Sequence, residues 1–207
     1  IRLGFEKATE KKLIKTNCVF SSEIDKYCIQ TYITNFGKTN FYGDITKLGS
    51  AENIIKTIPN FDLLFAGFPC QPFSKSGSQM GFGDQTRGTL FHDICYLAEK
   101  HKPKVLFLEN VPNLVKHDNG NTFSVIEQSL DGLGYDFEWA VLSPHKFGVP
   151  QVRTRVYIVA IRKDLANGRD FEFPTAGSTG QLDVRKILDK RVDAKYDMSE
   201  KEISWII

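Results

Sequence analysis

Two short apolar runs, each with a chemically reactive side chain near or just past its end, constrain the fold more than any other feature. The run from Asp62 to Gly67 is almost continuously apolar, as in strands that are covered on both faces of a parallel sheet. A second run extends from Val105 to Asn110. Ligands of open α/β sheets bind beyond the carboxyl ends of the strands. We therefore expect Cys70, just past the first run, and Glu109, near the end of the second, to share one site.

Helical and strand-like patterns alternate along the rest of the chain. Besides the two runs, the patterns predict helices at Arg2–Lys11, Ile24–Phe36, Thr89–His101 and Thr122–Leu133, and strands at Cys18–Ser22, Trp139–Leu142 and Val156–Arg162. This alternation is typical of βαβ units. The sequence therefore predicts an α/β fold, with a mainly parallel open sheet and helices on both of its faces.

Length and composition exclude several classes of protein. With 207 residues, of which 41% are hydrophobic, the chain can bury the core of one ordinary globular domain. It contains no apolar stretch approaching the roughly 20 residues of a membrane-spanning helix, and it opens with no signal-peptide pattern. We expect a cytoplasmic protein with no membrane partner.

Cysteine spacing and charge are less informative. The four cysteines contain no C-x-x-C pair, which argues against a zinc site and a disulfide framework, and we expect no metal. The formal charge of +2 is too small to indicate nucleic-acid binding by itself. A basic cluster between Lys146 and Lys163 is compatible with a local basic face, although a solvated surface strand is the more common outcome for such charges.

Cys70 lies in a segment that cannot simply continue a central strand. Pro69 and Pro72 fix backbone dihedrals and remove donors on either side of Cys70 and Gln71, so the chain must turn with the thiol at the bend. A lone cysteine is more often a small buried hydrophobe than a nucleophile. The glycine-rich stretch that follows, up to Gly88, predicts an active-site lid, since no Gly-Lys-Ser/Thr sequence marks a phosphate loop.

Three motifs then carry a resemblance to a known family. They are Gly67–Ser74 (GFPCQPFS), Glu109–Val111 (ENV) and Gln151–Tyr157 (QVRTRVY), with weaker matches at Arg2–Glu6, Glu23, Gly43–Ile45 and Arg87–Phe91. With them the chain resembles the catalytic region of DNA (cytosine-5)-methyltransferases of bacterial restriction-modification systems. The resemblance implies the Rossmann-like fold of S-adenosylmethionine-dependent methyltransferases, incomplete at both ends.

The resemblance also implies a covalent mechanism on a cytosine flipped out of duplex DNA. The Cys70 thiolate would add to C6, which makes C5 nucleophilic enough to attack the methyl group of S-adenosylmethionine. Glu109 would bind N3 and the exocyclic amine, and Arg155 would hold O2. Arg153 would support the loop or the thiol. Because the two arginines are two residues apart, we expect them on one face of a strand, although a salt-bridged strand edge is the alternative reading.

The resemblance also implies which residues bind the cofactor. Glu23 would bind the ribose hydroxyls of S-adenosylmethionine, as acidic residues do in nucleoside-binding α/β folds. Asp44 would accept a hydrogen bond from the adenine amine, although a turn-forming Gly-Asp is an equally good reading of that carboxylate. The apolar residues of the site would be Ile24, where the family often has a bulkier side chain, Ile45, Pro69 and Leu90.

The remaining expectations concern DNA and the extent of the chain. Gln71, Ser74 and Arg87 match positions in the lid or at the DNA. Residues 1–162 would form the catalytic domain and residues 163–207 a polar segment leading toward a target-recognition region. Because the family's glycine-rich first motif, recognition region and late Asn-containing motif are not matched, we expect weak activity or none from this chain alone. A complementary chain is one possible partner; a tRNA methyltransferase and a non-catalytic subunit are the alternative functions.

Overall fold

The computed structural model describes residues 1–48, 56–69, 90–166, 171–177, 183–191, 193–194 and 197–204. The chain divides into two compact units. Unit 1 comprises Ile1–Leu142 and Thr154–Pro174, and unit 2 comprises Ser143–Arg153 and Thr175–Ile207. Among the described residues, no helix combines the length and the apolar character needed to cross a membrane.

Unit 1 is built on a four-stranded sheet with the order β1-β2-β4-β3. The strands are β1 (Leu63–Gly67), β2 (Val105–Asn110), β3 (Tyr135–Leu142) and β4 (Arg155–Arg162). The β1 and β2 strands are parallel, whereas β4 is antiparallel to both β2 and β3. No crossover helix lies between β3 and β4, and without one two consecutive strands pair in antiparallel fashion. The expected open α/β sheet is thus confirmed, but it is mixed: only one of the three pairings among the described strands is parallel, where a mainly parallel sheet was expected.

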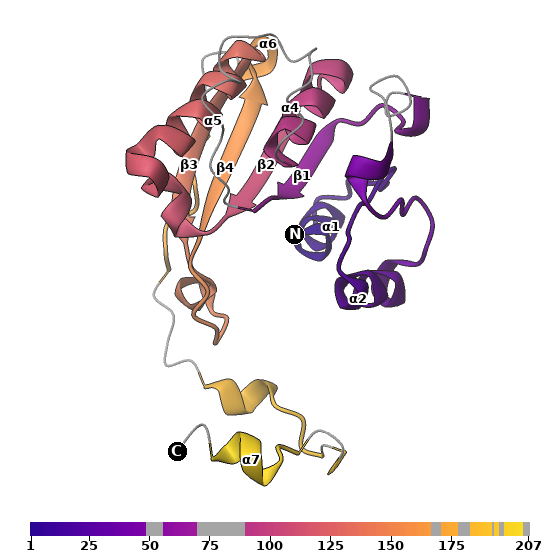
Figure 1. The fold of residues 1–207 in the computed structure, drawn as a ribbon, viewed down its shortest axis with the longest axis vertical. Coiled ribbons are helices and arrows are strands. Elements are labelled where there is room, and N and C mark those ends of the chain that lie inside the picture. The colour runs from indigo at the N-terminus through magenta and orange to yellow at the C-terminus, as the bar shows by residue number, and fades with distance from the viewer. Residues whose placement is uncertain are drawn as a thin grey trace. The chain divides into compact units, whose positions relative to one another are not determined.

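Helices cover both faces of this sheet, as expected (Figure 1). The α4 helix (Leu90–His101) and α5 helix (Asn121–Gly132) supply Phe91 and Ile126 to the main core, which they share with Leu106 and Leu108 of β2. The α1 helix (Arg2–Glu10) lies against the other face, where the ring centroid of Phe5 is 4.9 Å from that of Phe65. Alternate residues of β2 therefore serve two different environments.

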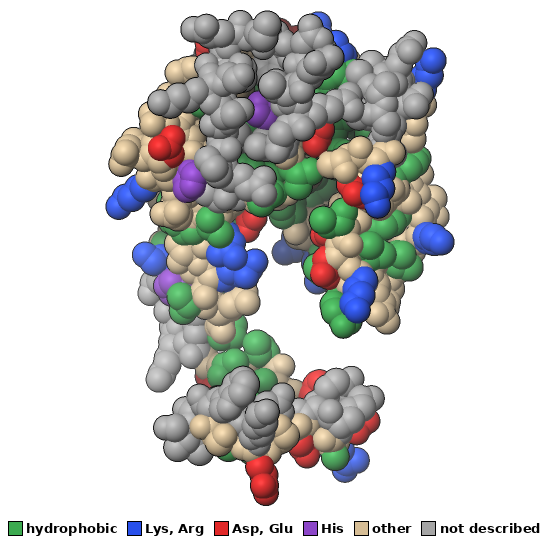
Figure 2. Space-filling model, viewed as in Figure 1, with side chains coloured by type: hydrophobic (Ala, Val, Ile, Leu, Met, Phe, Trp, Pro, Cys, Tyr) green, Lys and Arg blue, Asp and Glu red, His purple; other side chains and the backbone are tan. Residues whose placement is uncertain are grey.

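The first 48 residues are less buried than the residues of the sheet. The predicted strand at Cys18–Ser22 is wrong, because only an isolated bridge between Ser21 and Phe41 forms there. The α2 helix (Lys26–Phe36) is capped by the Asp25 side chain. Neither α1 nor α2 contains a fully buried residue, and hydrophobic side chains reach the surface in this part of unit 1 (Figure 2).

Several short elements complete the description. In unit 1 they are η1 (Ile45–Leu48), η3 (Pro112–Val115), η4 (His117–Gly120) and α6 (Lys163–Ala166), and in unit 2 they are η5 (Pro144–Phe147), η6 (Val184–Ile187) and α7 (Glu200–Ile203). The η4 turn places Asp118, Asn119 and Gly120 at positive φ in succession. A hydrogen bond of 2.7 Å between His117 Nδ1 and the buried Thr122 Oγ1 ties this turn to α5.

Candidate active site

Two residues predicted to bind the substrate base meet where β2 and β4 pair. Glu109 of β2 pairs with Tyr157 of β4, and Tyr157 is two residues past Arg155, where β4 begins. The Arg155 Nε atom lies 2.9 Å from Glu109 Oε1, and the side chains are 20% and 24% exposed. The structure therefore brings together a carboxylate and a guanidinium that are 46 positions apart in the sequence.

The second arginine is placed differently from the prediction. The β4 strand begins at Arg155, so Arg153 lies before the strand, is exposed and belongs to unit 2. The expectation that both arginines occupy one strand face is therefore wrong. The Arg153 backbone N–H donates to Oγ of the buried Ser143 over 3.2 Å, which closes the base of the loop between β3 and β4. The proposed role of the Arg153 side chain stays a prediction.

Asn110 is a site residue to which the sequence pattern assigned no role. It is 4% exposed and lies on the core-facing side of β2, opposite in direction to Glu109. Its Nδ2 donates to the backbone oxygen of Phe68 over 2.7 Å, and its Oδ1 accepts from the Val111 N–H over 2.8 Å. A polar residue at a buried position of an apolar strand was the available signal. Asn110 thereby fixes the backbone two residues before Cys70.

Several predicted residues lie outside the described part of the chain. They are Cys70, Gln71, Ser74 and Arg87, together with the expected lid between Gln71 and Gly88. The described residues on either side are Pro69, which is exposed just past β1, and Leu90, which is half-buried at the start of α4. These two predicted wall residues thus flank the segment that carries the predicted nucleophile.

Two of the described cysteines, Cys95 and Cys28, are poorly suited to act as nucleophiles. Burial raises the pKa of the Cys95 thiol to about 12, so this sulfur stays protonated at neutral pH. The exposed Cys28 has a raised pKa because its thiol hydrogen-bonds to the Asp25 carboxylate. Among the described residues, no group of three or more His, Cys, Asp or Glu side chains could hold a metal ion.

The two carboxylates predicted for the cofactor lie on adjacent segments. The Glu23 N–H donates to the Gly43 oxygen over 3.1 Å, and the Tyr42 N–H donates to the Ser21 oxygen over 2.9 Å. These bonds place Glu23 beside Gly43 and Asp44, although Glu23 and Asp44 are 21 positions apart in the sequence. Gly43 has a φ of 69°, a conformation that favours glycine. The pairing therefore forms a small polar cluster from two distant parts of the chain.

Local hydrogen bonds orient both carboxylates. Glu23 Oε1 accepts from the backbone N–H groups of Ile24 and Asp25 at 2.8 and 3.1 Å. Asp44 Oδ1 accepts from the Thr46 hydroxyl and backbone N–H at 2.7 and 2.9 Å, and these bonds hold the pKa of Asp44 below its usual value. Asp44 is therefore an ionised acceptor at neutral pH, as an adenine amine would require.

The predicted apolar residues of the cofactor site differ in environment. Ile24 is 68% exposed and thus open to a ligand. Ile45 packs against the small cluster of Ile58 and Leu97, so only part of its surface is available.

A polar network close to Glu23 connects α1 with α2 through Ser21, Arg2 and Tyr32. The Tyr32 hydroxyl accepts a hydrogen bond from Arg2 Nη1 and forms another with Ser21 Oγ. Arg2 also pairs with Glu6 at 2.7 Å, and its guanidinium carbon lies 4.2 Å from the centre of the Phe36 ring. The network fixes Ser21, two residues before Glu23, where main-chain pairing is sparse.

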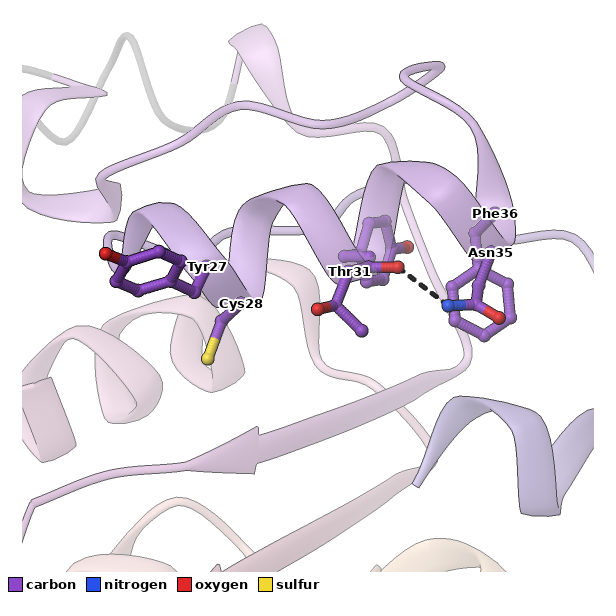
Figure 3. A pocket seen from close by; sticks show the side chains of 6 residues that line it. Tyr27, Cys28, Thr31, Asn35 and Phe36 are labelled. Atoms are coloured by element: carbon purple, nitrogen blue, oxygen red, sulfur yellow. Dashed lines mark hydrogen bonds between the residues drawn. The ribbon is translucent and has the colours of Figure 1, made fainter. Parts of the chain in front are cut away.

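A shallow groove runs along α2 in the same region (Figure 3). It has a volume of about 380 Å³ and is lined by Tyr27, Cys28, Thr31, Tyr32, Asn35 and Phe36. The Asn35 side chain donates to the Thr31 backbone oxygen over 2.8 Å, which leaves a mainly apolar wall. None of the predicted cofactor residues lines this groove, so it is distinct from the carboxylate cluster.

Comparisons with known proteins identify a family and several similar proteins. The family model for C-5 cytosine-specific DNA methylases matches residues 1–205. The Type II methyltransferase M1.ScrFI of Lactococcus lactis subsp. cremoris is 46% identical over 201 residues, covering 97% of this chain and 48% of its own length. M.HhaI of Haemophilus parahaemolyticus is 47% identical over 171 residues, covering 83% of this chain and 49% of its own.

Solved structures show the same fold at lower identity. A DNMT2 mutant of Spodoptera frugiperda superposes with a TM-score of 0.66 and 22% identity, covering 93% of this chain and 58% of its own. The Dnmt2 methyltransferase of S. pombe gives a TM-score of 0.66 and 19% identity, and the match covers 97% of this chain and 61% of the S. pombe chain. This chain thus spans about half the length of the curated relatives described above.

Proposed function

Because the chain belongs to the C-5 cytosine-specific DNA methylase family, we propose that it forms the catalytic part of an enzyme that methylates C5 of cytosine in duplex DNA. The observation that carries the proposal is the ion pair between Glu109 and Arg155 beside the end of β1. A paired carboxylate and guanidinium can together recognise the polar edge of a pyrimidine. The Type II methyltransferases among its relatives favour a role in a restriction-modification system.

In the proposed reaction Cys70 supplies the nucleophile. Its thiolate would form a bond to C6 of the cytosine, and the electron pair of the C5–C6 double bond would become available at C5 to accept the methyl group. The bond between that methyl group and the sulfonium sulfur of the donor substrate would break, with its electron pair left on the sulfur. Loss of the C5 proton and expulsion of the thiolate then restore the aromatic ring. Splitting the reaction in this way replaces one difficult step with easier ones. Because C6 is inaccessible within a stacked duplex, the base must be flipped out.

Glu109 and Arg155 would hold the flipped ring. Arg155 uses Nε for Glu109 and donates from Nη1 to the Thr154 backbone oxygen over 2.8 Å. Its Nη2 has no hydrogen-bond partner among the described residues and is free to donate to the cytosine O2. Glu109 would contact N3 and the exocyclic amine, where a proton shared with the ring stabilises the charge that develops during addition.

The fold family implies S-adenosylmethionine, and the carboxylate cluster fits it. Glu23 would bind the ribose hydroxyls and the ionised Asp44 the adenine amine, since both oxygens are oriented by backbone donors. Ile24, Ile45, Pro69 and Leu90 would supply apolar contacts. When bound, S-adenosylmethionine provides the electrophilic methyl group. The side chains of this chain would only bind and orient it.

The remaining roles concern DNA and the rest of the protein. Gln71, Ser74 and Arg87 would contact the DNA near the flipped base, and Arg153 would support the same region. Residues 1–162 would act as the catalytic domain, and residues 163–207 would lead toward the recognition region. Because the relatives are about twice as long, we expect the 207 residues alone to be weakly active or inactive.

Replacement of the proposed nucleophile tests this function. In the full-length protein, Cys70→Ser should abolish transfer of a labelled methyl group from S-adenosylmethionine to duplex DNA, whereas Cys28→Ser should transfer at the unsubstituted rate. Undiminished transfer by Cys70→Ser would exclude the thiol mechanism. Transfer to tRNA in place of DNA would instead favour the RNA-directed alternative. Binding of both ligands with no transfer to either nucleic acid would favour a non-catalytic subunit.

A further inference from the structure

Gly67 is a glycine whose backbone does not require one. The glycines that adopt positive φ in the described chain are Gly37, Gly43, Gly120, Gly134 and Gly148, and Gly67 is not among them. It is the last residue of β1, where most residue types could adopt the same extended conformation. The reason for a missing side chain must therefore lie in the surroundings.

Those surroundings are the side chain of Glu109. Gly67 and Glu109 are register partners in the parallel β1–β2 pair, so a side chain at residue 67 would project on the same face as Glu109. A Cβ atom at Gly67 would lie 3.4 Å from Glu109 Oε2 and 3.9 Å from the Glu109 backbone oxygen. By contrast, a Cβ atom at Gly132 would meet nothing within 4 Å.

The two oxygens of Glu109 are consequently in different situations. Oε1 is occupied by Arg155 Nε at 2.9 Å. Oε2 lies over Gly67 and has no hydrogen-bond donor among the described residues. A methyl group at residue 67 would bring apolar surface into van der Waals contact with Oε2 and cover the side that faces β1. An acceptor oxygen that is covered without a partner loses its solvation and its access to a ligand.

We propose that Gly67 is a positioning residue that keeps Glu109 Oε2 open, so that this oxygen accepts a hydrogen bond from the exocyclic amine of the target cytosine. The inference rests on the proposed function, which it deepens by assigning different tasks to the two oxygens. Arg155 neutralises and orients the carboxylate through Oε1, while the space left by Gly67 admits the amine to Oε2. Gly67 itself makes no contact with a reacting atom.

The test compares two target bases in two proteins. In the full-length protein, dissociation constants are measured for duplexes that carry either cytosine or pyrimidin-2-one, which lacks the amine, at the methylation site. Both substitutions are made in the Cys70→Ser variant, which forms no thiolate bond to C6 of either base. Pyrimidin-2-one also pairs more weakly with guanine and is flipped more easily, so the readout is the change that a substitution makes in the ratio of the two dissociation constants. Gly67→Ala should shift this ratio about tenfold toward pyrimidin-2-one, the effect of one hydrogen bond to a charged acceptor, and retain the dissociation constant for S-adenosylmethionine, whereas the control Gly132→Ala should leave the ratio unchanged.

The outcomes separate the inference from the function on which it rests. A ratio of the two dissociation constants that Gly67→Ala leaves unchanged would overturn the inference. Loss of the thermal unfolding transition in Gly67→Ala would also overturn it, because Gly67 would then be needed for the fold. Absence of methyl transfer by the unsubstituted protein would instead contradict the proposed function.

Discussion

The sheet of unit 1 and its first 48 residues hold their predicted site residues by different forces. Glu109 projects from β2, whose neighbours Leu106 and Leu108 are fully buried, so packing fixes the strand that carries it. Glu23 and Asp44 instead lie on irregular segments beside helices without a fully buried residue, and hydrogen bonds hold them in place. The proposed base site should therefore be rigid, whereas loss of a single polar contact should be enough to alter the proposed cofactor site.

The largest expected contrast is in the free energy of unfolding. Ile126→Ala removes a fully buried side chain from α5 and should destabilise the protein by about 2–5 kcal/mol. Ile33→Ala makes the same change on α2, where the side chain is only half-buried, and should cost less than about half as much. Urea unfolding of both variants measures the difference. Equal losses would mean that the two regions are packed alike.

A second prediction concerns the backbone before Cys70. Asn110→Ala leaves the Phe68 carbonyl without its 2.7 Å donor in a buried position, which should cost about 1–3 kcal/mol. Methyl transfer should fall more than stability alone explains, because the segment that leads to the nucleophile is released. Asn113→Ala, at an exposed position in η3, is the matched control. The proposed positioning role would be contradicted by a variant that is destabilised but transfers methyl groups at the unsubstituted rate.

The third prediction probes the polar network close to Glu23. Tyr32→Phe removes the hydroxyl that bonds Ser21 and Arg2, and should cost about 0.5–1.5 kcal/mol of stability. Its dissociation constant for S-adenosylmethionine should rise while that for duplex DNA stays unchanged, which calorimetric titration can measure. Tyr27→Phe alters a residue that is 66% exposed and serves as the control. If DNA affinity fell in parallel, the two sites would not be held independently.

The sequence predicted the buried strands better than the exposed ones. The bounds of β2 match the prediction at Val105–Asn110, because an uninterrupted apolar run has few alternatives in a sheet. The β3 strand begins at Tyr135, four residues before the predicted start at Trp139. The prediction missed these residues because the exposed Asp136 and Glu138 interrupt the apolar pattern. The segment Cys18–Ser22 is similarly apolar in part, yet it makes only one bridge. Strand character there depends on a neighbour that sequence periodicity does not reveal.

The predictions of site residues differ in a similar way, between residues that belong to motifs and contacts that depend on the fold. Motifs placed Glu109 and Arg155 in one site, and the structure joins them at 2.9 Å. The role of Asn110 could not be predicted, because its partner is a backbone oxygen 42 residues away. The importance of an empty position at Gly67 depends likewise on the register of β1 with β2. Contacts that arise only from strand register are therefore what the sequence alone could not supply.

The smallest expected effect is a pH dependence at the start of α2. Asp25 Oδ1 accepts from the backbone N–H groups of Cys28 and Tyr27, each at 2.9 Å, and these bonds lower the pKa of Asp25. A lowered pKa in the folded state contributes stability above the unfolded value, about 3.9, and loses it as the pH falls through the folded value. The difference in melting temperature between the unsubstituted protein and Asp25→Ala should thus be full at pH 7 and shrink below about pH 4.

Thermal unfolding followed by circular dichroism between pH 7 and pH 3 measures this difference, with the exposed Glu10→Ala as the control. Because α2 has no fully buried residue, its cap is among the few interactions that fix where the helix begins. A difference that stays constant down to pH 3 would show that the ionised carboxylate contributes nothing beyond its shape. The first 48 residues would then depend on packing, as the sheet does, and the contrast between the two regions would fail.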